Sequence, residues 1–375
     1  MDRRSFIASS LLVGASGCLA ACSSRLGRAY PVGAEPTPGA TPLSPWLDAL
    51  LQDAARAPSS HNSQPWSLLL QSPKRWQMRL ESSRRLDVVD PHCRESWISL
   101  GAFYAALETS AVARGLRLDL QGTGCASEGA DTADIAIRPC SPDTEWLASL
   151  RARRCLRRDL TGATVDARAL QIASATDGAV SQFLPLPSAE AQAISLHTVE
   201  AEVIQKRMEA IWEELADWVR WSASAEQANP TGITPAGMEL RLLARLWVAA
   251  TYGREDVVAP DFRLRSLQSC RQCVNEGAGW WVIATPGDDR DAWLAAGRCL
   301  MRVWLACTRM GLALHPMSQA LEVPEIRERL AQRLGLGNLQ MLVRIGKPPR
   351  MLEPVSPRLA PLQFAESLFT EGALN

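Results

Sequence analysis

Apolar side chains recur along the chain with two different periods. Over residues 45–55 they recur every three or four positions, which predicts an amphipathic helix. Ser44-Pro45 supports this start, because it supplies an N-cap serine followed by a proline at the first helical position. Over Trp76–Leu80 apolar and polar side chains alternate, which predicts a strand. The chain therefore combines helices with strands.

The same two periods predict the remaining elements. Further helices are expected over residues 94–114, 188–222, 236–250, 291–310 and 324–334, and further strands over residues 66–70, 116–120, 133–137, 280–285 and 339–345. Helices and strands are mixed without regular strand–helix–strand alternation, so we predict an α+β fold. The sequence contains no Walker loop, GxGxxG motif or GxSxG motif.

The first 22 residues have the pattern of an export signal. Arg3-Arg4-Ser5-Phe6-Ile7 opens an apolar run that ends near Ala21 and is too short for a comfortable membrane span. The paired arginines resemble a twin-arginine (Tat) signal, and Leu19-Ala20-Ala21-Cys22 resembles a lipobox. We therefore predict export by the Tat translocase to the periplasm or cell envelope, with lipidation at Cys22 as the only membrane attachment. Residues 23–43, rich in Ser, Gly, Pro and Thr, are expected to form a flexible linker.

Composition narrows the class of protein. Hydrophobic residues make up 47% of the chain and charged residues 21%, which is typical of a globular protein. The 40 basic and 40 acidic residues balance, so no basic excess favours nucleic-acid binding. Cys270-Arg271-Gln272-Cys273 forms a CxxC motif without a second Cys or His pair at zinc spacing, so we predict no metal site. A local disulfide and two free or buried thiols both remain open for this pair.

A polar loop carries the most specific chemical signal. In Pro58-Ser59-Ser60-His61-Asn62-Ser63-Gln64-Pro65, two prolines enclose six side chains that bear hydroxyl, imidazole or amide groups. Such a loop is suited to hydrogen-bonding a flat polar ligand. With Ala57 and Trp66 it resembles the FMN-binding loop of the nitroreductase superfamily. The resemblance implies that FMN contacts Pro58, Ser59, Ser60, Asn62 and Gln64, while His61 is expected to orient the loop.

Three later segments extend this resemblance. Arg153-Arg154-Cys155-Leu156-Arg157-Arg158 is similar to the basic segment that holds the FMN phosphate and ribityl chain, with Cys155 in place of the usual Ser or Thr. Residues 311–319 resemble the segment that lies against the flavin. The strand over 342–346 and the downstream Arg358 resemble the end of the family's chain. The resemblance implies cofactor contacts from Arg153, Arg154, Cys155, Arg157, Pro316, Met317, Ser318, Gln319 and Arg358.

The order of these motifs is unusual for the superfamily. The polar loop precedes the arginine segment, and each half of the chain lacks what the other retains. This order resembles the Acg-like branch, in which two degenerate halves in one chain mimic a dimer. It implies an N-terminal half at 44–140, a C-terminal half at 141–375 with a helical lid at about 185–275, and a monomer that acts as a pseudo-dimer.

The resemblance implies an FMN-dependent oxidoreductase of the nitroreductase type. Such an enzyme would take two electrons from NAD(P)H or another donor and pass them to a small nitroaromatic or quinone-like acceptor. No catalytic side chain is assigned. The alternative is an FMN-binding or storage protein whose lid closes over the flavin.

Overall fold

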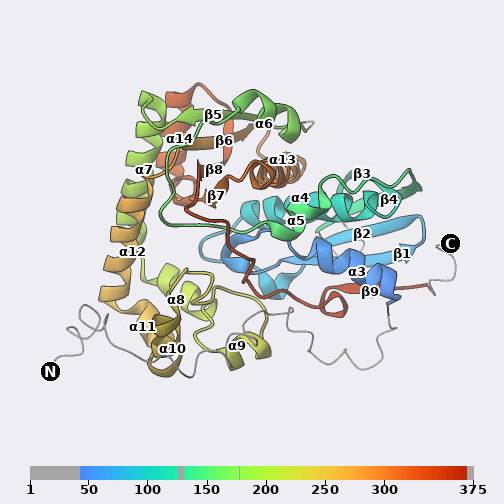
Figure 1. Ribbon diagram of the computed structural model, residues 1–375, viewed down its shortest axis with the longest axis horizontal. Helices are drawn as coiled ribbons and strands as arrows, with labels where there is room; N and C mark the ends of the chain where they lie inside the picture. Colours follow the sequence, from blue (N-terminus) through green and yellow to red (C-terminus); the bar gives the residue numbers. More distant parts are fainter. Residues whose placement is uncertain (1–42, 126–130, 177, 370–375) are drawn as a thin grey trace. The chain divides into compact units, whose positions relative to one another are not determined.

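Two β-sheets, with helices between them and around them, form the part of the chain that the computed structural model describes (Figure 1). The described residues are 43–125, 131–176 and 178–369. The predicted export signal, the lipidation of Cys22 and nearly all of the predicted linker lie outside them and stay predictions. The α+β fold predicted from the sequence is confirmed by the mixture of helices and strands.

The first sheet has five strands in the order β3-β4-β2-β1-β9. Its strands are β1 (Trp66–Ser72), β2 (Arg75–Leu80), β3 (Leu116–Cys125), β4 (Asp131–Pro139) and β9 (Ala365–Ser367). Helices α3 (Pro45–Ala54) and α4 (Arg94–Val112) contribute to the same hydrophobic core as these strands. The predicted start of α3 is confirmed, since Ser44 Oγ accepts a hydrogen bond from the Leu47 N–H at 3.3 Å.

The second sheet has four antiparallel strands in the order β5-β6-β8-β7. Its strands are β5 (Val180–Pro185), β6 (Gly279–Thr285), β7 (Ala313–Pro316) and β8 (Asn338–Gly346). Alternate residues of β6 enter different cores: Trp280 and Val282 pack in one, and Trp281 and Ile283 pack in the other. Both faces of β6 are therefore covered by apolar side chains, which explains why the sequence of this strand is apolar without alternation.

Helices cover the two faces of the second sheet. On one face lie α6 (Ala167–Ser174) and α13 (Arg290–Arg309), and on the other lie α7 (Ala189–Gln205), α14 (Pro324–Leu334) and the end of α12 (Pro260–Cys273). Short helices α5 (Leu147–Ala152), η1 (Ser60–Asn62), η2 (Ser82–Arg84), η3 (Gln319–Leu321) and η4 (Pro361–Gln363) complete the two halves. Strands β5, β7 and β9 were not predicted from the sequence, because three to six residues give too little periodicity.

A further group of helices has a small hydrophobic core of its own. It comprises α8 (Glu209–Asp217), α10 (Leu242–Thr251) and α11 (Arg254–Val258), and the short helix α9 (Ala223–Ala228) lies between α8 and α10 in the chain. The predicted continuous helix over 188–222 is wrong, since α7 ends at Gln205 and α8 begins at Glu209. Trp212 accounts for part of this break, because its indole N–H donates to the Gln205 carbonyl at 3.2 Å, near the end of α7. The predicted lid region, 185–275, thus contains both this group and helices packed on the second sheet.

Helices α4 and α13 meet between the two sheets through a symmetric pair of glycines. A Cβ atom on Gly101 would lie 2.2 Å from the Leu294 carbonyl oxygen, and one on Gly297 would lie 1.9 Å from the Ile98 carbonyl oxygen. The sequence around both glycines repeats the pattern Arg-acid-x-Trp-aliphatic-x-x-Gly, at residues 94–101 and 290–297. Ile98 and Leu294 occupy matching places in this repeat, so the contact relates the two helices by an approximate two-fold axis.

The C-terminal segment returns from the second sheet to the first. After β8, the chain pairs β9 in parallel with β1, so Ala365 lies opposite Leu68. On the way it passes the polar loop at residues 58–64. The fold thereby brings the polar loop together with residues 357–359, which lie almost 300 residues further along the sequence.

The described residues show neither a membrane span nor a cluster of metal-ligating side chains. None of the helices in the described ranges has the length and apolarity needed to cross a bilayer. Within the same ranges, no group of three His, Cys, Asp or Glu side chains is placed to hold a metal ion. Cys270 and Cys273 are free, buried thiols, which decides between the two alternatives for the CxxC motif.

Candidate functional site

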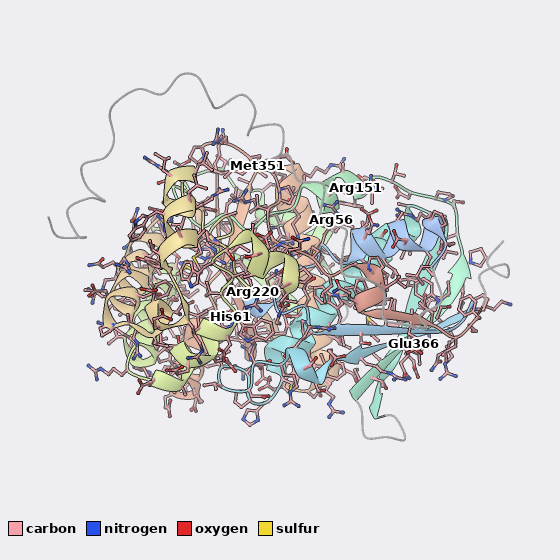
Figure 2. The ribbon with its side chains drawn as sticks, turned by 90° about the horizontal axis from the view of Figure 1, so that it is seen from below. Arg56, His61, Arg151, Arg220, Met351 and Glu366 are labelled. Carbon is pink, nitrogen blue, oxygen red and sulfur yellow. The ribbon has the colours of Figure 1, made fainter. Side chains whose placement is uncertain are left out.

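The polar loop adopts a strained backbone. His61 (φ 49°), Asn62 (φ 54°) and Gln64 (φ 54°) all have left-handed conformations, although none of them is glycine (Figure 2 labels His61). Each such residue costs on the order of 1–3 kcal/mol and persists only where its surroundings fix it. Strained residues are concentrated at ligand sites, so the backbone conformation of this loop indicates that it binds a ligand.

Asn62 fastens the loop to two distant segments. Its Nδ2 donates to the carbonyl oxygens of Gly232 and Pro357, each at 3.1 Å. Its Oδ1 accepts a hydrogen bond from the Arg358 guanidinium. The structure therefore brings Arg358 to the loop, where the carboxamide of Asn62 positions the protein backbone.

Gln64 plays a similar part and is fully buried. Its Nε2 donates to the Pro230 carbonyl at 2.8 Å, and its Oε1 accepts from the Leu359 N–H at 2.9 Å. The N–H of Gln64 in turn donates to Ser59 Oγ at 2.9 Å, which leaves the Ser59 hydroxyl proton for another acceptor. Pro58 opens the loop and is partly buried.

The arginine segment lies beside β7. An isolated parallel bridge joins Cys155 to Leu314. Arg153 is buried, donates from Nε to the Arg56 carbonyl at 3.1 Å and lies 4.6 Å over the Trp304 ring. Burial raises the pKa of the Cys155 thiol. Arg153 therefore joins the end of the segment after α3 to α13, while Cys155 is partly buried.

Arg154 and Arg157 point to different surroundings. Arg154 donates to the carbonyl oxygens of Glu353 at 2.5 Å and Ala236 at 3.2 Å. Arg157 lies with its NH1 3.4 Å from His315 Nε2. Among the predicted arginines, Arg157 is thus the one that the structure places next to the segment beginning at Pro316.

The segment after His315 is held by β8. Met317 is part of the hydrophobic core, and its N–H donates to the Leu342 carbonyl at 2.9 Å. Ser318 Oγ donates to the Met341 sulfur at 3.6 Å. Gln319 Nε2 donates to Glu202 at 3.3 Å. These contacts fix the backbone at 316–319, so the side chain of Met317 is structural while Gln319 remains at the edge of the site.

Three buried polar atoms in these segments have no hydrogen-bond partner among the described residues. They are His61 Nδ1, Arg157 Nε and Gln319 Oε1. Buried polar groups are normally paired, and leaving one unpaired costs about 1–3 kcal/mol. The three atoms come from the three segments that the sequence predicted to share one site. Together they offer donors and an acceptor to a polar ligand.

The charge of this site favours an anionic ligand group. Burial, followed by the charge of Arg157, lowers the pKa of His61 to about 4. Burial and the charges of Arg157 and Arg344 lower the pKa of His315 well below its usual value. Both imidazoles are therefore neutral at neutral pH, first because they are buried and second because the guanidinium groups beside them are charged.

Arg344 contacts both Arg157 and His315 and so fixes their positions. It is fully buried in β8, donates to the Arg157 carbonyl at 2.6 Å and contacts His315 Nδ1 at 2.9 Å. Its nearest carboxylate, Glu276, lies 3.7 Å away. Arg344 was not predicted as a site residue, although a charged residue inside an otherwise apolar strand is a visible signal in the sequence.

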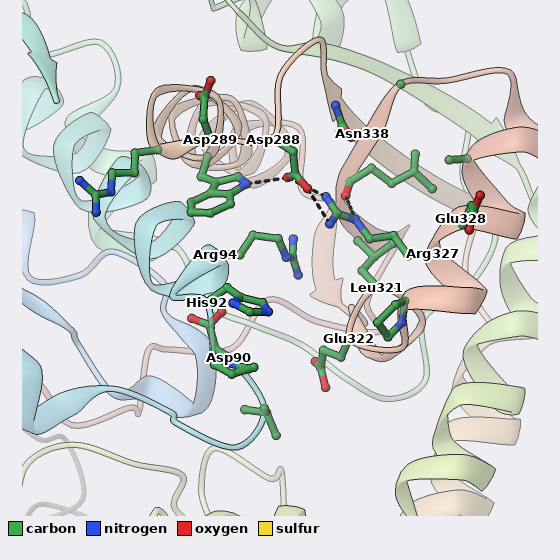
Figure 3. A pocket seen from close by; sticks show the side chains of 18 of the residues that line it. Asp90, His92, Arg94, Asp288, Asp289, Leu321, Glu322, Arg327, Glu328 and Asn338 are labelled. Carbon is green, nitrogen blue, oxygen red and sulfur yellow. Dashed lines mark hydrogen bonds and ion pairs between the residues drawn. The ribbon is translucent and has the colours of Figure 1, made fainter. Parts of the chain in front are cut away.

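A pocket opens beside these segments, between the start of α4 and the loops before α13 and α14 (Figure 3). Its volume is about 1110 Å³. Arg327 and Asp288 form an ion pair at 2.9 Å on one wall, and Asp90, Arg94 and Glu322 lie on another. Burial would raise the pKa of Asp288, but hydrogen bonds from Arg327, Gln340 and Trp293 outweigh it and lower that pKa to about 2.

A row of carboxylates connects this pocket to the polar loop. Ser60 donates to Glu95, and Arg94 donates to the same carboxylate at 2.9 Å. Glu322 accepts a hydrogen bond from Gln205 Nε2 at 2.6 Å. Burial, followed by repulsion from Glu95, raises the pKa of Glu322 to about 8. Glu95 and Glu322 were not predicted as site residues, because their proximity depends on the packing of the two halves.

Replacing Glu322 with glutamine is expected to change how stability depends on pH. The folded protein raises the pKa of Glu322 above its ordinary value, so the stabilising contribution is complete below about pH 4.5 and is lost as the pH rises through about 8. Glu322→Gln should therefore raise the free energy of unfolding above pH 8, relative to wild type, by at least about 1.4 kcal/mol, the equivalent of one pKa unit. Urea titrations of both proteins at pH 5, 7 and 9 measure the free energy of unfolding at each pH.

Glu328 provides a matched control for this prediction. It lines the same pocket but is exposed. Glu328→Gln should leave the pH dependence of unfolding as in wild type, within about 0.5 kcal/mol. If Glu322→Gln and wild type kept parallel profiles from pH 5 to 9, the raised pKa of Glu322 would be refuted.

Comparison with known proteins gives a family match to part of the chain. Residues 192–347 match the sequence model described as the Nitroreductase family. This range includes most of the region predicted to form the lid, at about 185–275.

Two named relatives from Mycobacterium tuberculosis cover most of the chain. The protein named "Putative NAD(P)H nitroreductase Rv3131" is 26% identical over 316 residues, which cover 81% of this chain and 86% of the relative. "Putative NAD(P)H nitroreductase acg" is 26% identical over 327 residues, which cover 82% of this chain and 91% of the relative.

Among solved structures, the FMN and NADPH-dependent nitroreductase NfnB from sphigopyxis sp. strain HMH is 18% identical, with a TM-score of 0.39. The alignment covers 58% of this chain and 96% of that chain.

Proposed function

We propose that this protein is an FMN-dependent oxidoreductase of the nitroreductase type. It takes electrons from NAD(P)H or another two-electron donor and passes them to a small nitroaromatic or quinone-like acceptor. The family match over residues 192–347 and the names of the relatives support this class of activity. The observation that carries the proposal is that each of the three segments predicted to share one site holds a buried polar atom without a partner among the described residues, on His61, Arg157 and Gln319.

The residues of this site fit the chemistry of FMN. Arg157 offers a buried N–H and a positive charge to the phosphate, and Arg358 adds a second guanidinium at the polar loop. The hydroxyl proton of Ser59 and the amide oxygen of Gln319 suit the polar edge of a flat ring. When bound, FMN supplies the two-electron chemistry, and the protein supplies binding and orientation. Asn62 and Gln64 hold the loop in shape.

We further propose that the chain is a fused pseudo-dimer that builds one such site per monomer. The matching repeats at 94–101 and 290–297, and the symmetric contact of Gly101 with Gly297's helix, support this proposal. The site draws the polar loop from the N-terminal half and Arg157, Gln319 and Arg358 from the C-terminal half. We also propose export by the Tat translocase and lipidation at Cys22, supported by the sequence of residues 1–22.

One observation favours the second candidate, an FMN-binding or storage protein. The segment before α10 lies directly on the polar loop, since the N–H of Gly232 donates to the Asn62 carbonyl at 3.0 Å. Arg157 N–H also donates to Glu239 in that segment, at 2.8 Å. A segment fastened in this way would restrict access of a donor or an acceptor to the flavin.

Flavin content followed by reduction tests the proposal and separates the two candidates. The purified protein is expected to be yellow, or to become yellow with added FMN, and anaerobic NADPH is expected to bleach it. Protein that stays yellow with NADPH, yet is bleached by dithionite, would support storage or a different donor. Colourless protein that takes up no FMN would refute both candidates.

A further inference from the structure

Helix α10 has an apolar face that the described part of the chain leaves exposed. Leu242 is 41% exposed, Leu243 72%, Leu246 61% and Trp247 36%. Of its ten residues, Val248 is the buried one. A surface helix normally turns its apolar side inwards, so large apolar side chains on the outer side indicate a binding surface.

The exposed residues form one continuous face. At 100° per residue, Leu242, Leu246, Leu243 and Trp247 fall within an arc of about 140°, and the exposed Ala249 and Ala250 fall beside or within it. Val248 lies on the opposite side, in the small core with Val257. The four large side chains therefore point together, away from the rest of the protein.

The charges around this face suit an anionic surface. Arg241 precedes the helix and is exposed, and Arg245 lies within it. Residues 241–251 contain two arginines and no acidic residue, whereas Arg254, further on, is paired with Glu213 and Asp217. Trp247 packs edge-on against Tyr252, with ring centroids 5.1 Å apart. Leucines flanked by arginines and amphipathic aromatic rings are typical of helices that lie in the membrane interface.

We propose that α10 docks on the surface of an anionic phospholipid bilayer, with Leu242, Leu243, Leu246 and Trp247 inserted among the acyl chains and Arg241 at the headgroups. The length of chain before the described residues is compatible with this contact. Residues 23–42 join Cys22 to Leu43, and twenty extended residues span up to about 70 Å. A lipid anchor at Cys22, as proposed above, would hold α10 within reach of the bilayer. The proposed membrane contact of α10 does not depend on whether the candidate site binds FMN.

Vesicle binding of the full chain with Cys22→Ser, which removes acylation, tests this proposal. The probe is a vesicle of equal parts phosphatidylcholine and phosphatidylglycerol, measured by co-sedimentation. Adding Leu243→Glu and Leu246→Glu is expected to lower the partition coefficient at least about 10-fold, because two buried leucines contribute several kcal/mol. Adding Ile172→Glu and Leu196→Glu is the matched control, since these residues are 70% and 67% exposed on α6 and α7. The control should bind as the parent does.

A fluorophore placed on the helix makes the test independent of the N-terminal segment. An environment-sensitive dye attached at Leu243→Cys should shift to the blue when vesicles are added, and the same dye at Ile172→Cys should not. No shift at position 243, or equal binding by both charge-substituted pairs, would overturn the proposal. A different result would identify a second copy of the chain as the partner of this face. In that case gel filtration would show a dimer that Leu243→Glu and Leu246→Glu abolish, while vesicle binding would stay unchanged, and the proposal would be wrong.

Discussion

Replacing Gly297 with alanine is expected to destabilise the protein by about 3 kcal/mol or more, which is a large share of the roughly 5–15 kcal/mol by which a folded domain is typically stable. The new Cβ would lie 1.9 Å from the Ile98 carbonyl oxygen and 2.8 Å from the Ala102 nitrogen. Both neighbours are helix backbone atoms, which cannot rotate away as a side chain can. Helices α4 and α13 would have to separate, and each of them lies in the core of its own half.

Gly162 supplies the control for this substitution. A Cβ there meets no atom within 4 Å, and its backbone does not need glycine. Gly162→Ala should therefore change the free energy of unfolding by less than about 1 kcal/mol. Gly101→Ala should reproduce the loss seen with Gly297→Ala, because its Cβ would lie 2.2 Å from the Leu294 carbonyl oxygen. Urea titration measures all three, and a stable Gly297→Ala protein would contradict the close helix contact.

Elements with strong local signals could be predicted from the sequence. Helix α14 was predicted at its observed bounds, Pro324–Leu334, because a proline opens it and Gly335 closes it with a left-handed backbone. Strand β6 was predicted within one residue, because an uninterrupted apolar run needs cover on both faces. In both cases neighbouring residues along the chain contain all the information that the prediction requires.

The chemistry of individual site residues could not be predicted in the same way. Asn62 and Gln64 are held by partners that lie from 166 to 296 residues away in the sequence. The arginines of residues 153–158 cannot be told apart from the local sequence, yet Arg153 packs on Trp304 while Arg157 contacts His315. These differences follow from the packing of α13 and β7 against the segment, which no local pattern encodes.

The repeat around Gly101 and Gly297 is an intermediate case. Its residues can be read from the sequence, but its meaning depends on seeing that the two helices touch. Arg290 of the second copy lies 5.8 Å over the ring of Trp97 in the first. The repeated residues therefore form the contact between the two halves, and they also show that the halves are similar.

Replacing Arg157 with alanine is expected to weaken FMN binding roughly 10- to 100-fold, since a charge-assisted hydrogen bond contributes about 1.5–3 kcal/mol. The backbone of this residue is held by Glu239, Arg344 and Cys273, so its loop should keep its place without the side chain. The side chain itself makes one long contact, to His315, and has a buried Nε without a partner among the described residues. Removing it should therefore affect the ligand more than the fold. Fluorescence titration of the apoprotein with FMN measures the change.

Arg158 makes this test specific, because it is the next residue in the same basic segment and is exposed. Arg158→Ala removes the same charge from the chain but no group from the site, so its affinity for FMN should stay within about 3-fold of wild type. A general electrostatic effect would weaken binding equally in both variants, whereas a contact with the ligand weakens it in Arg157→Ala alone. If Arg157→Ala retained FMN as wild type does, the phosphate would have to be held elsewhere, and Arg358 at the polar loop would be the remaining guanidinium placed to hold it.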